Sequence, residues 1–517
     1  MHSPTHHHRR ALRRLLHASA LCLGMAAAHA GWTPIAPMDE ARAQHTATLL
    51  SGSTVLVAGG DTGNVDGGNN PIALASTRLY NPATNTWSNG PDLPSPRFGH
   101  TATALPGGTV LLVGGRATGP VNSADANTLL YDPLANTFAT SAGQLALRRS
   151  HHTATLLPDG TVLVAGGRGI AGQEALSSVE IFDPGTGTWS SGMDLPARRR
   201  EHTATLLPDG RVLVVGGYDN GNTATQGAYL RDPATGAWTE VPTPALNTFY
   251  RAQHTATLLP DGRVLVAGGN AIVTTTLVFN PADNTWAAGP NLPAFEFGGH
   301  TATGLPGAPG NVLVAGGNTG ANASAVTSTV SPASGAGQAI RQPDLITARL
   351  GHTATLLAGG QVLALGGYTE LGNGSPTSTG ELYTHTAPLP PANVTAQPGN
   401  AQVTVRWQAP AGNGTTPALF TVTAQPGGRT CTASYPATSC TVAGLANGTP
   451  YTFTVVATAL GGIDSAPSAP PAAATPSAAA PGGPGNAQGV PTLSQWGVLL
   501  LAALMLWAGT RRRAVSA

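Results

Sequence analysis

Seven histidines in this 517-residue chain each begin the tetrapeptide His-Thr-Ala-Thr, and imidazoles repeated in this way could ligate a metal. They are His45, His100, His152, His202, His254, His300 and His352. Seven imidazoles on separate repeats cannot all converge on one ion at a bond length of about 2 Å. We therefore expect buried hydrogen-bonding roles for these histidines and no metal site.

Arginine is the second residue type that recurs at a fixed place, three positions before a repeat histidine. It occurs there six times, as Arg42, Arg97, Arg149, Arg199, Arg251 and Arg349, and Phe297 takes the remaining place. A more varied set follows the Gly-Gly pair of each unit: Asp61, Arg116, Arg168, Tyr218, Asn270, Asn318 and Tyr368. Guanidinium groups suit carboxylate and phosphate. We expect the arginines of both sets, with Tyr218 and Tyr368, to form a ligand-binding rim; the alternative is that each arginine pairs with a carbonyl or an Asp of a neighbouring repeat.

The elements that would position these residues are short strands. Residues 149–157 alternate as a strand does, Pro158-Asp159-Gly160 is a tight-turn signal, and residues 161–165 are β-branched and aliphatic. A third strand over 179–184 and a fourth beginning at Trp189 complete the unit. Units of four antiparallel strands repeating about every fifty residues predict the blades of a propeller, with the first strand lining the central channel.

The repeat resembles a known family. Each unit begins with Arg-x-x-His, contains Gly-Gly, and continues to an aromatic-Asp/Asn-Pro motif followed by an aromatic residue, as in Tyr80-Asn81-Pro82 with Trp87. This pattern is similar to the kelch repeat and covers residues 31–386. The resemblance implies an all-β fold that begins with a seven-bladed kelch-type β-propeller.

The aromatic residues also indicate how the ring closes. The last repeat has no Trp after its third strand near Tyr383, whereas Trp32 stands alone before the first repeat. Trp32 precedes His45 by 13 residues, the same interval that separates Trp87 from His100. We therefore predict that residues 31–38 form the fourth strand of the seventh blade and hide an otherwise open sheet edge.

Propellers of this kind include galactose oxidase-like copper enzymes, which supply the enzymatic alternative. That family requires a Cys crosslinked to a copper-bound Tyr, and residues 31–386 contain no Cys. A nucleophile elbow, a phosphate loop and a paired-carboxylate signature are also missing from the sequence. We predict no enzymatic activity, no catalytic residues and no cofactor.

A second pattern occupies residues 388–475. A strand-borne Trp407 and the later Leu445-Ala446-Asn447-Gly448-Thr449-Pro450-Tyr451 run are similar to a fibronectin type III domain, which implies a β-sandwich with Trp407 and Tyr451 in its core. Cys431 and Cys440 are the only cysteines beyond residue 30. In an exported protein we expect them to form a disulfide across a hairpin; the alternative is two free thiols.

The sequence predicts a targeting segment at each end of the chain. Residues 1–30 combine basic residues, a short apolar stretch and the small-x-small sequence Ala28-His29-Ala30, as a secretory signal peptide does. Residues 476–489 are a Pro/Ala/Gly-rich linker. Residues 490–517 contain Val-Pro-Thr-Leu-Ser-Gln-Trp, an apolar transmembrane run and three arginines, and resemble the IPTL-CTERM sorting signal of bacterial envelope proteins. That resemblance implies recognition and cleavage by a membrane sorting enzyme; the alternative is a plain anchor.

Composition limits the classes of function. Only 9% of residues are charged, and seven of the 25 basic residues lie in the two end segments, which contain no acidic residue. The body is therefore mildly acidic, which argues against binding to nucleic acid. We predict an exported protein of the bacterial envelope or surface that recognises an extracellular glycan or protein, with anionic groups favoured, through the Arg-rich rim. The alternatives are an oxidase of galactose oxidase-like descent and a structural matrix protein without a discrete ligand.

Overall fold

The computed structural model describes residues 31–478, with internal gaps, and the chain divides into two compact units, residues 1–386 and 387–517. The gaps are 68–69, 119–126, 142, 170–173, 244–249, 270–273, 294–297, 307–310, 321, 332–338, 372–373, 385–387, 411–416 and 460–463. The expected signal peptide and sorting tail, and all but the first residues of the expected linker, lie outside the described residues. Within those residues every regular element is a strand, and no helix is long and apolar enough to cross a membrane.

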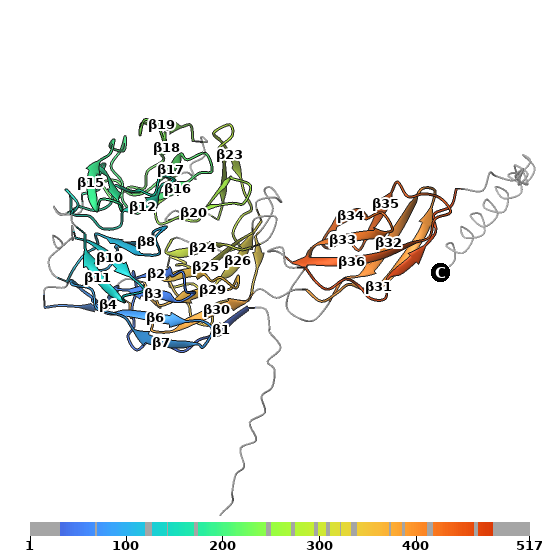
Figure 1. Ribbon diagram of the computed structural model, residues 1–517, viewed down its shortest axis with the longest axis horizontal. Helices are drawn as coiled ribbons and strands as arrows, with labels where there is room; N and C mark the ends of the chain where they lie inside the picture. The colour runs from blue at the N-terminus through green and yellow to red at the C-terminus, as the bar shows by residue number, and fades with distance from the viewer. Residues whose placement is uncertain are drawn as a thin grey trace, which may run out of the picture. The chain divides into compact units, whose positions relative to one another are not determined.

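The first unit contains seven four-stranded antiparallel sheets in its described residues, which confirms the predicted number of blades (Figure 1). Blades one to three comprise β2 (Thr46–Leu49), β3 (Val55–Ala58), β6 (Thr77–Asn81) and β7 (Thr86–Asn89); β8 (Thr101–Ala104), β9 (Val110–Val113), β10 (Thr128–Asp132) and β11 (Thr137–Thr140); and β12 (Thr153–Leu156), β13 (Val162–Ala165), β14 (Val179–Asp183) and β15 (Thr188–Ser191). A hairpin of β4 (Asp61–Val65) and β5 (Pro71–Ala73) extends blade one.

The next three blades keep the same strand order. They comprise β16 (Thr203–Leu206), β17 (Val212–Val215), β18 (Ala228–Arg231) and β19 (Trp238–Val241); β20 (Thr255–Leu258), β21 (Val264–Ala267), β22 (Leu277–Asn280) and β23 (Thr285–Ala288); and β24 (His300–Gly304), β25 (Val312–Gly316), β26 (Thr327–Val330) and β27 (Ile340–Arg341).

The seventh blade joins the two ends of the propeller segment. It comprises β28 (Thr353–Leu356), β29 (Val362–Leu365), β30 (Gly380–Thr384) and β1 (Gly31–Pro34). Trp32 pairs with Tyr383 in register, their ring centroids lie 5.2 Å apart, and Trp32 Nε1 donates a hydrogen bond of 3.0 Å to Thr327 Oγ1 of blade six. The predicted closure at residues 31–38 is therefore confirmed for the strand 31–34.

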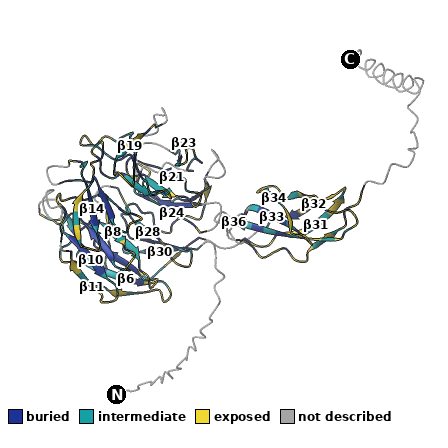
Figure 2. Ribbon diagram, turned by 45° about the horizontal axis from the view of Figure 1, so that its top comes forward, coloured by how far each residue is buried: buried dark blue, intermediate teal, exposed yellow. Residues whose placement is uncertain are grey.

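The blades form because their second strands are aliphatic on both faces. Every residue of β13 is buried, as is every residue of β9 and β17. Leu111 and Val113 of blade two pack against Val162, Val164 and Phe182 of blade three, so each core is shared by two blades. Figure 2 shows this gradient: β14 is largely buried, whereas the outer strand β11 is largely exposed.

The second unit is a β-sandwich, as predicted. One sheet contains β31 (Ala392–Gly399), β32 (Gln402–Gln408) and β35 (Ser439–Ala443); the other contains β34 (Arg429–Ser434), β33 (Pro417–Gln425), β36 (Tyr451–Ala459) and β37 (Ala472–Ala474). Trp407 is buried and stacks at 5.1 Å on Phe420, and Tyr451 packs partly buried against the same core.

The expected disulfide is present, but it spans a different pair of elements. Cys431 lies on β34 and Cys440 on β35, and their Cα atoms are 6.2 Å apart. These strands are consecutive in the chain yet belong to opposite sheets, so the bond ties the two layers of the sandwich together instead of two strands of one hairpin.

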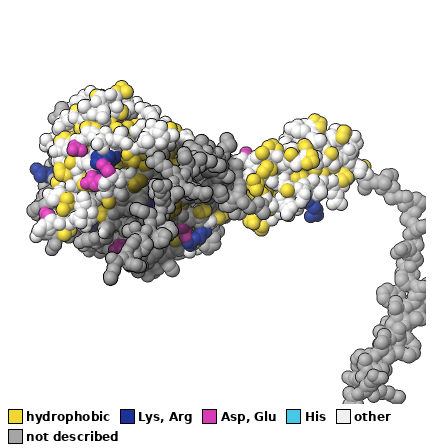
Figure 3. Space-filling view, turned by 90° about the horizontal axis from the view of Figure 1, so that it is seen from below, with side chains coloured by type: hydrophobic (Ala, Val, Ile, Leu, Met, Phe, Trp, Pro, Cys, Tyr) yellow, Lys and Arg dark blue, Asp and Glu magenta, His cyan; other side chains and the backbone are white. Residues whose placement is uncertain are grey.

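Charged side chains are sparse on the surface. In the face that Figure 3 presents, they stand as small separate groups among hydrophobic and neutral polar side chains.

Candidate functional site: the propeller funnel

The six arginines that precede the repeat histidines do not form a rim, which corrects the expectation from sequence. Each of them is fully buried. In every case Nη1 donates to the carbonyl of the first glycine of the Gly-Gly pair in the same blade, at 2.6–2.9 Å; the residues are Arg42, Arg97, Arg149, Arg199, Arg251 and Arg349. The side chains turn into the blades because those carbonyls are buried away from water and need a hydrogen-bond donor from the protein. Their role here is structural.

The Gly-Gly pair completes this contact between neighbouring blades. Gly115 N donates to Arg149 O of the next blade at 2.9 Å, and equivalent bonds recur around the described ring. A Cβ on Gly114 would lie 2.9 Å from Cε1 of His152, so the glycine makes room for the histidine of the next blade. Both glycines have positive φ, which a side chain would strain.

The repeat histidines form a second ring of contacts. Nε2 of each lies 2.9–3.1 Å from the Oγ1 of the first Thr in the preceding His-Thr-Ala-Thr unit, and the bond between His45 and Thr353 closes the circle. Burial lowers the pKa of each imidazole, to about 3 for His100 and His254 and to about 4 for His300. These histidines are neutral and join neighbouring blades through hydrogen bonds, as expected from their repetition.

The residue immediately before each repeat histidine faces the channel, and we call these seven the channel ring. They are Gln44, Gly99, His151, Glu201, Gln253, Gly299 and Gly351. All seven have φ between 51° and 70°. Backbone hydrogen bonds join six of the seven successive pairs, for example Gly99 N to Gln44 O at 3.1 Å and His151 N to Gly99 O at 2.9 Å. The scaffold is thus repeated, while the side chains that it presents differ from blade to blade.

A cavity of about 670 Å³ opens at this end of the channel. Its walls are the channel ring, the repeat histidines and several residues that follow Gly-Gly. Of the predicted rim residues, Asp61, Arg116, Arg168, Asn318 and Tyr368 line it. Asn270 and Phe297 lie outside the described residues.

A chain of hydrogen bonds crosses the floor of this cavity. Tyr368 OH donates to Asp61 Oδ2 and accepts from Gln44 Nε2 at 3.1 Å. Gln44 Oε1 lies 3.1 Å from Nε2 of His151, whose Nδ1 lies 3.2 Å from Ser150 Oγ. Burial raises the pKa of both Asp61 and Tyr368 and lowers that of His151, so burial favours the neutral form of all three groups. These groups hold one another and fix the ring of Tyr368.

A second cluster lies beside His151, on blades four and five. Arg200 Nη1 donates to Glu201 Oε1 at 2.6 Å, and Gln253 Nε2 donates to Glu201 Oε2 at 2.6 Å. The Arg200 guanidinium carbon stands 5.0 Å from the centroid of Tyr218. Tyr218 therefore supports Arg200 and is not among the residues that line the cavity.

Two arginines of the cavity lack such partners. Arg116 is 8% exposed, its guanidinium lies over the ring of Phe98 with the carbon 5.3 Å from the centroid, and its Nε is buried without a hydrogen bond. Arg168, on the next blade, makes no side-chain hydrogen bond or ion pair with any described residue. Burial lowers the pKa of both, and for Arg168 the charges of Arg116 and Arg200 lower it further. Cations so placed favour an anion.

Sequence reasoning identified Arg116, Arg168 and Tyr368 but missed the channel ring. Gln44, His151 and Glu201 each stand one position before a histidine that repeats. These residues could have been found from the sequence because they vary from repeat to repeat while the histidine that follows them is constant. A residue that supports the scaffold recurs in every blade, whereas a residue that recognises a ligand need not.

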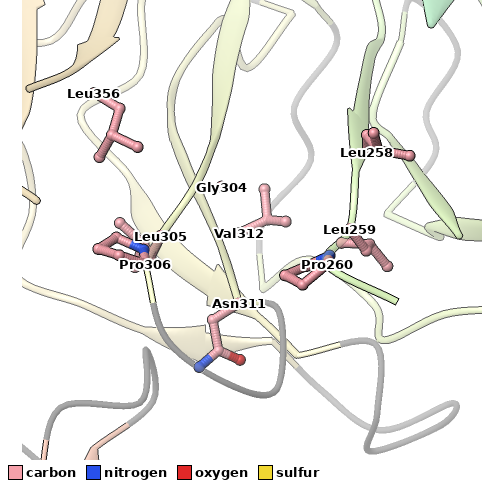
Figure 4. A pocket seen from close by; sticks show the side chains of 9 residues that line it. All are labelled: Leu258, Leu259, Pro260, Gly304, Leu305, Pro306, Asn311, Val312 and Leu356. Carbon is pink, nitrogen blue, oxygen red and sulfur yellow. The ribbon is translucent and has the colours of Figure 1, made fainter. Parts of the chain in front are cut away.

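A second hollow lies near the turns between first and second strands, at the other end of the channel strands. Its volume is about 310 Å³, and Figure 4 shows the side chains of Leu258, Leu305 and Leu356 around it, with Asn311 the one side chain that carries polar atoms. This apolar hollow has no charged group to orient a ligand.

Among the described residues, no group of three or more His, Cys, Asp or Glu side chains is placed to hold a metal ion. The Cys–Tyr crosslink of the copper oxidases has no counterpart either, since residues 31–386 contain no Cys. The funnel presents guanidinium, amide and hydroxyl groups.

Comparison with known families finds three matches along the chain. Residues 44–269 and 139–317 match the KLHDC2/KLHL20/DRC7 Kelch-repeats domain, and together these ranges cover more than half of the chain. Residues 389–473 match the fibronectin type III domain. Residues 488–513, beyond the described part, match the IPTL-CTERM motif.

Similar proteins share only segments or the fold. Human Kelch-like protein 33 is 32% identical over 102 residues, 20% of this chain and 17% of that protein. Mouse Kelch-like protein 35 is 27% identical over 205 residues, 40% of this chain and 32% of that protein. A fungal alcohol oxidase of the AA5 family, solved with copper, aligns over 87% of this chain and 100% of its own with a TM-score of 0.57 and 16% identity, a likeness of fold alone.

Proposed function

The chain belongs to the kelch-repeat family, and from that premise we propose that it is a binding protein whose funnel recognises an anionic group of an extracellular glycan or protein. The IPTL-CTERM motif indicates a bacterial protein that is exported and sorted to the surface. A membrane processing enzyme that reads this motif is the second partner. Release of the body after processing is part of the same proposal.

The observation that carries the proposal is the pair Arg116 and Arg168. An arginine that is nearly removed from water and lacks a carboxylate partner is costly, and a bound anion offsets that cost. Arg116 is 8% exposed and Arg168, on the adjacent blade, is half-buried; neither makes an ion pair with a described carboxylate, and both line a cavity large enough for a small chemical group. The six buried arginines differ, because their guanidinium groups already serve backbone carbonyls.

Binding is favoured over catalysis by the state of the other polar groups. Tyr368, Gln44 and His151 are engaged with one another, and Glu201 is held by Arg200 and Gln253. None of them forms a pair of nucleophile and base. The oxidase-like fold adds no chemistry at 16% identity.

The test is a binding survey with the full-length chain. Wild type and the R116Q/R168Q double variant are applied to an array of bacterial and host glycans and to immobilised extracellular proteins. R263Q, which removes a partly exposed arginine paired with Asp261 outside the cavity, is the matched control. We expect at least a tenfold loss of affinity in the double variant and no change in R263Q. Equal binding by all three proteins, or no binding by wild type, would refute the funnel site and leave a structural matrix role.

A further inference from the structure

We propose that the funnel binds a uronic acid residue of an acidic polysaccharide, with its carboxylate on Arg116 and Arg168 and its sugar ring over Gly351 against Tyr368. This inference rests on the proposed function and names the ligand of the same cavity. Three features of the described residues carry it: the balance of charge, the place of the free space, and the fixed aromatic ring beside that space.

The balance of charge favours a ligand with one negative charge. Asp61 acts electrostatically on Arg116, and Glu201 acts on Arg168, so each unpaired arginine stands within reach of one acid. A phosphate dianion or a run of acidic residues would be repelled by these two carboxylates. A single carboxylate on a body that carries hydroxyl groups is accommodated, because hydroxyls donate hydrogen bonds to acceptors such as Glu201.

The free space lies on one side of the channel ring. Gln44, His151, Glu201 and Gln253 extend side chains into the cavity, and the ring of His151 covers Gly99, where a Cβ would lie 2.8 Å from His151 Cε1. A Cβ on Gly299 would lie 3.3 Å from both the backbone nitrogen of Gly351 and the Cβ of Leu350, so that position is crowded. A Cβ on Gly351 would meet only Tyr368, at 3.6 Å from Cδ2 and 3.8 Å from Cε2, which is ordinary van der Waals contact. The room for the body of a ligand is therefore above Gly351.

The free space above Gly351 is bounded by the aromatic ring of Tyr368, whose position is fixed. The Tyr368 hydroxyl is held by Asp61 and Gln44, so the ring cannot swing into the cavity. Leu350 lines the same side. An apolar face beside polar groups suits a sugar, which presents C–H bonds on its ring face and hydroxyls at its edge.

Gly351 allows this geometry to be tested without altering the arginines. Gln44 and Gln253 hold glutamine at the same place in blades one and five, with φ of 52° and 55°, and Gly351 has φ of 60°. Gly351→Gln therefore places in blade seven the side chain that two other blades already accept, and it fills the room beside Tyr368. Gly351→Ala has the same backbone with a single added carbon. Gly107→Gln, at a turn where nothing lies within 4 Å, is the matched control.

The experiment is calorimetric titration of the full-length chain and these variants with sodium D-glucuronate, sodium D-galacturonate, D-glucose and D-glucose 6-phosphate, with a thermal melt of each variant to verify folding. We expect a uronate to bind wild type at least tenfold more tightly than glucose or glucose 6-phosphate. Gly351→Gln and R116Q/R168Q should each lose at least tenfold in uronate affinity, Gly351→Ala should lose affinity by a smaller factor, and Gly107→Gln should bind within threefold of wild type.

Each contrary outcome identifies what has failed. Tighter binding of the phosphate, or uronate binding that Gly351→Gln leaves unchanged, overturns the uronate assignment. Arginine-dependent binding of a protein on the survey arrays, without uronate binding, overturns it too and leaves the proposed function standing. Absence of any arginine-dependent binding in both experiments overturns both. If Gly351→Gln fails to fold, a loss of uronate binding in the folded Gly351→Ala variant supports the assignment, and unchanged binding counts against it.

Discussion

His151 Nε2 lies 3.1 Å from Gln44 Oε1, so a side chain of blade three meets one of blade one by passing over blade two. The passage exists because the intervening member of the channel ring is Gly99. This contact links Ser150 and His151 through Gln44 to Tyr368 and Asp61, and it sets the floor on which a ligand would rest. The repeat fixes where the backbone of each channel-ring residue lies, and the side chains that differ between blades form the surface of the cavity.

Gly99→Ala should dismantle this floor. Its Cβ would stand 2.8 Å from the His151 ring, which must then move and release Gln44. We expect a loss of stability of about 1–3 kcal/mol, as for other overpacked sites. Denaturant unfolding measures the loss, and imidazole NMR of His151 reports the broken bond. Gly107→Ala, with open space around it, should change neither; an unperturbed His151 signal in Gly99→Ala would contradict the geometry.

The ring of repeat histidines should make the protein sensitive to mild acid. Their folded pKa values are lowered, to about 3 for His100 and His254, whereas an unfolded histidine titrates near about 6.5. Because the folded pKa is the lower one, the stability that the neutral imidazoles contribute is present above about pH 6.5 and is lost as the pH falls toward the folded values.

The measurement is the free energy of unfolding at a series of pH values. Between about pH 6.5 and 5, above the range in which most carboxylates titrate, unfolding should take up several protons and the free energy should fall steeply. His100→Gln should lower the slope by the contribution of one site. A flat profile in this window would show that the histidines are not held neutral.

The strand that closes the ring should be essential. Trp32→Ala removes a buried indole that contacts Tyr383 and Thr327, and we expect a loss of about 3–5 kcal/mol, typical of a buried Trp. Deleting residues 31–40 should unfold or aggregate the propeller. Thermal melts measure both, with Thr33→Ala, an exposed residue of the same strand, as the control. An unchanged melt of the deletion would exclude closure by β1.

The buried arginines should contribute to stability and not to binding. Arg149 Nη2 contacts Glu180 Oε1 at 2.5 Å, and both side chains are buried. Arg149→Met leaves the carboxylate unpaired, so we expect a loss of about 3–5 kcal/mol. Arg149→Met/Glu180→Gln should recover part of it, since the amide carries no charge. Denaturant unfolding compares the stability of the single and double variants. A stable Arg149→Met variant that loses ligand binding would show that Arg149 belongs to the binding site.

The blade number, the strand order and the closure at Trp32 were predictable because they depend on spacing. A period of about fifty residues, the Gly-Gly pairs and the interval from Trp32 to His45 all follow from local strand and turn chemistry repeated along the chain. The core residues of β9, β13 and β17 were predictable for the same reason, since a fully aliphatic strand is stable only when both of its faces are covered.

The direction of each polar side chain was not predictable. Arg149 and Arg168 are both arginines at the channel end of one blade, yet Arg149 turns inward to a glycine carbonyl and Arg168 faces the cavity. That choice depends on which carbonyls neighbouring strands leave without a donor, and those carbonyls come from residues far along the chain. The disulfide shows the same limit, because Cys431 and Cys440 are close in sequence while their strands belong to different sheets.

The sequence by itself therefore determined the scaffold of seven blades, a closing strand and a sandwich, because each of these depends on local patterns of residues. The tertiary structure alone decided which side chains are left for a ligand. Arg116 and Arg168 make no ion pair with a described carboxylate, and the room beside Tyr368 exists because blade seven has Gly351 where blades one and five have glutamine. Both are properties of the assembled ring, in which residues hundreds of positions apart share one cavity.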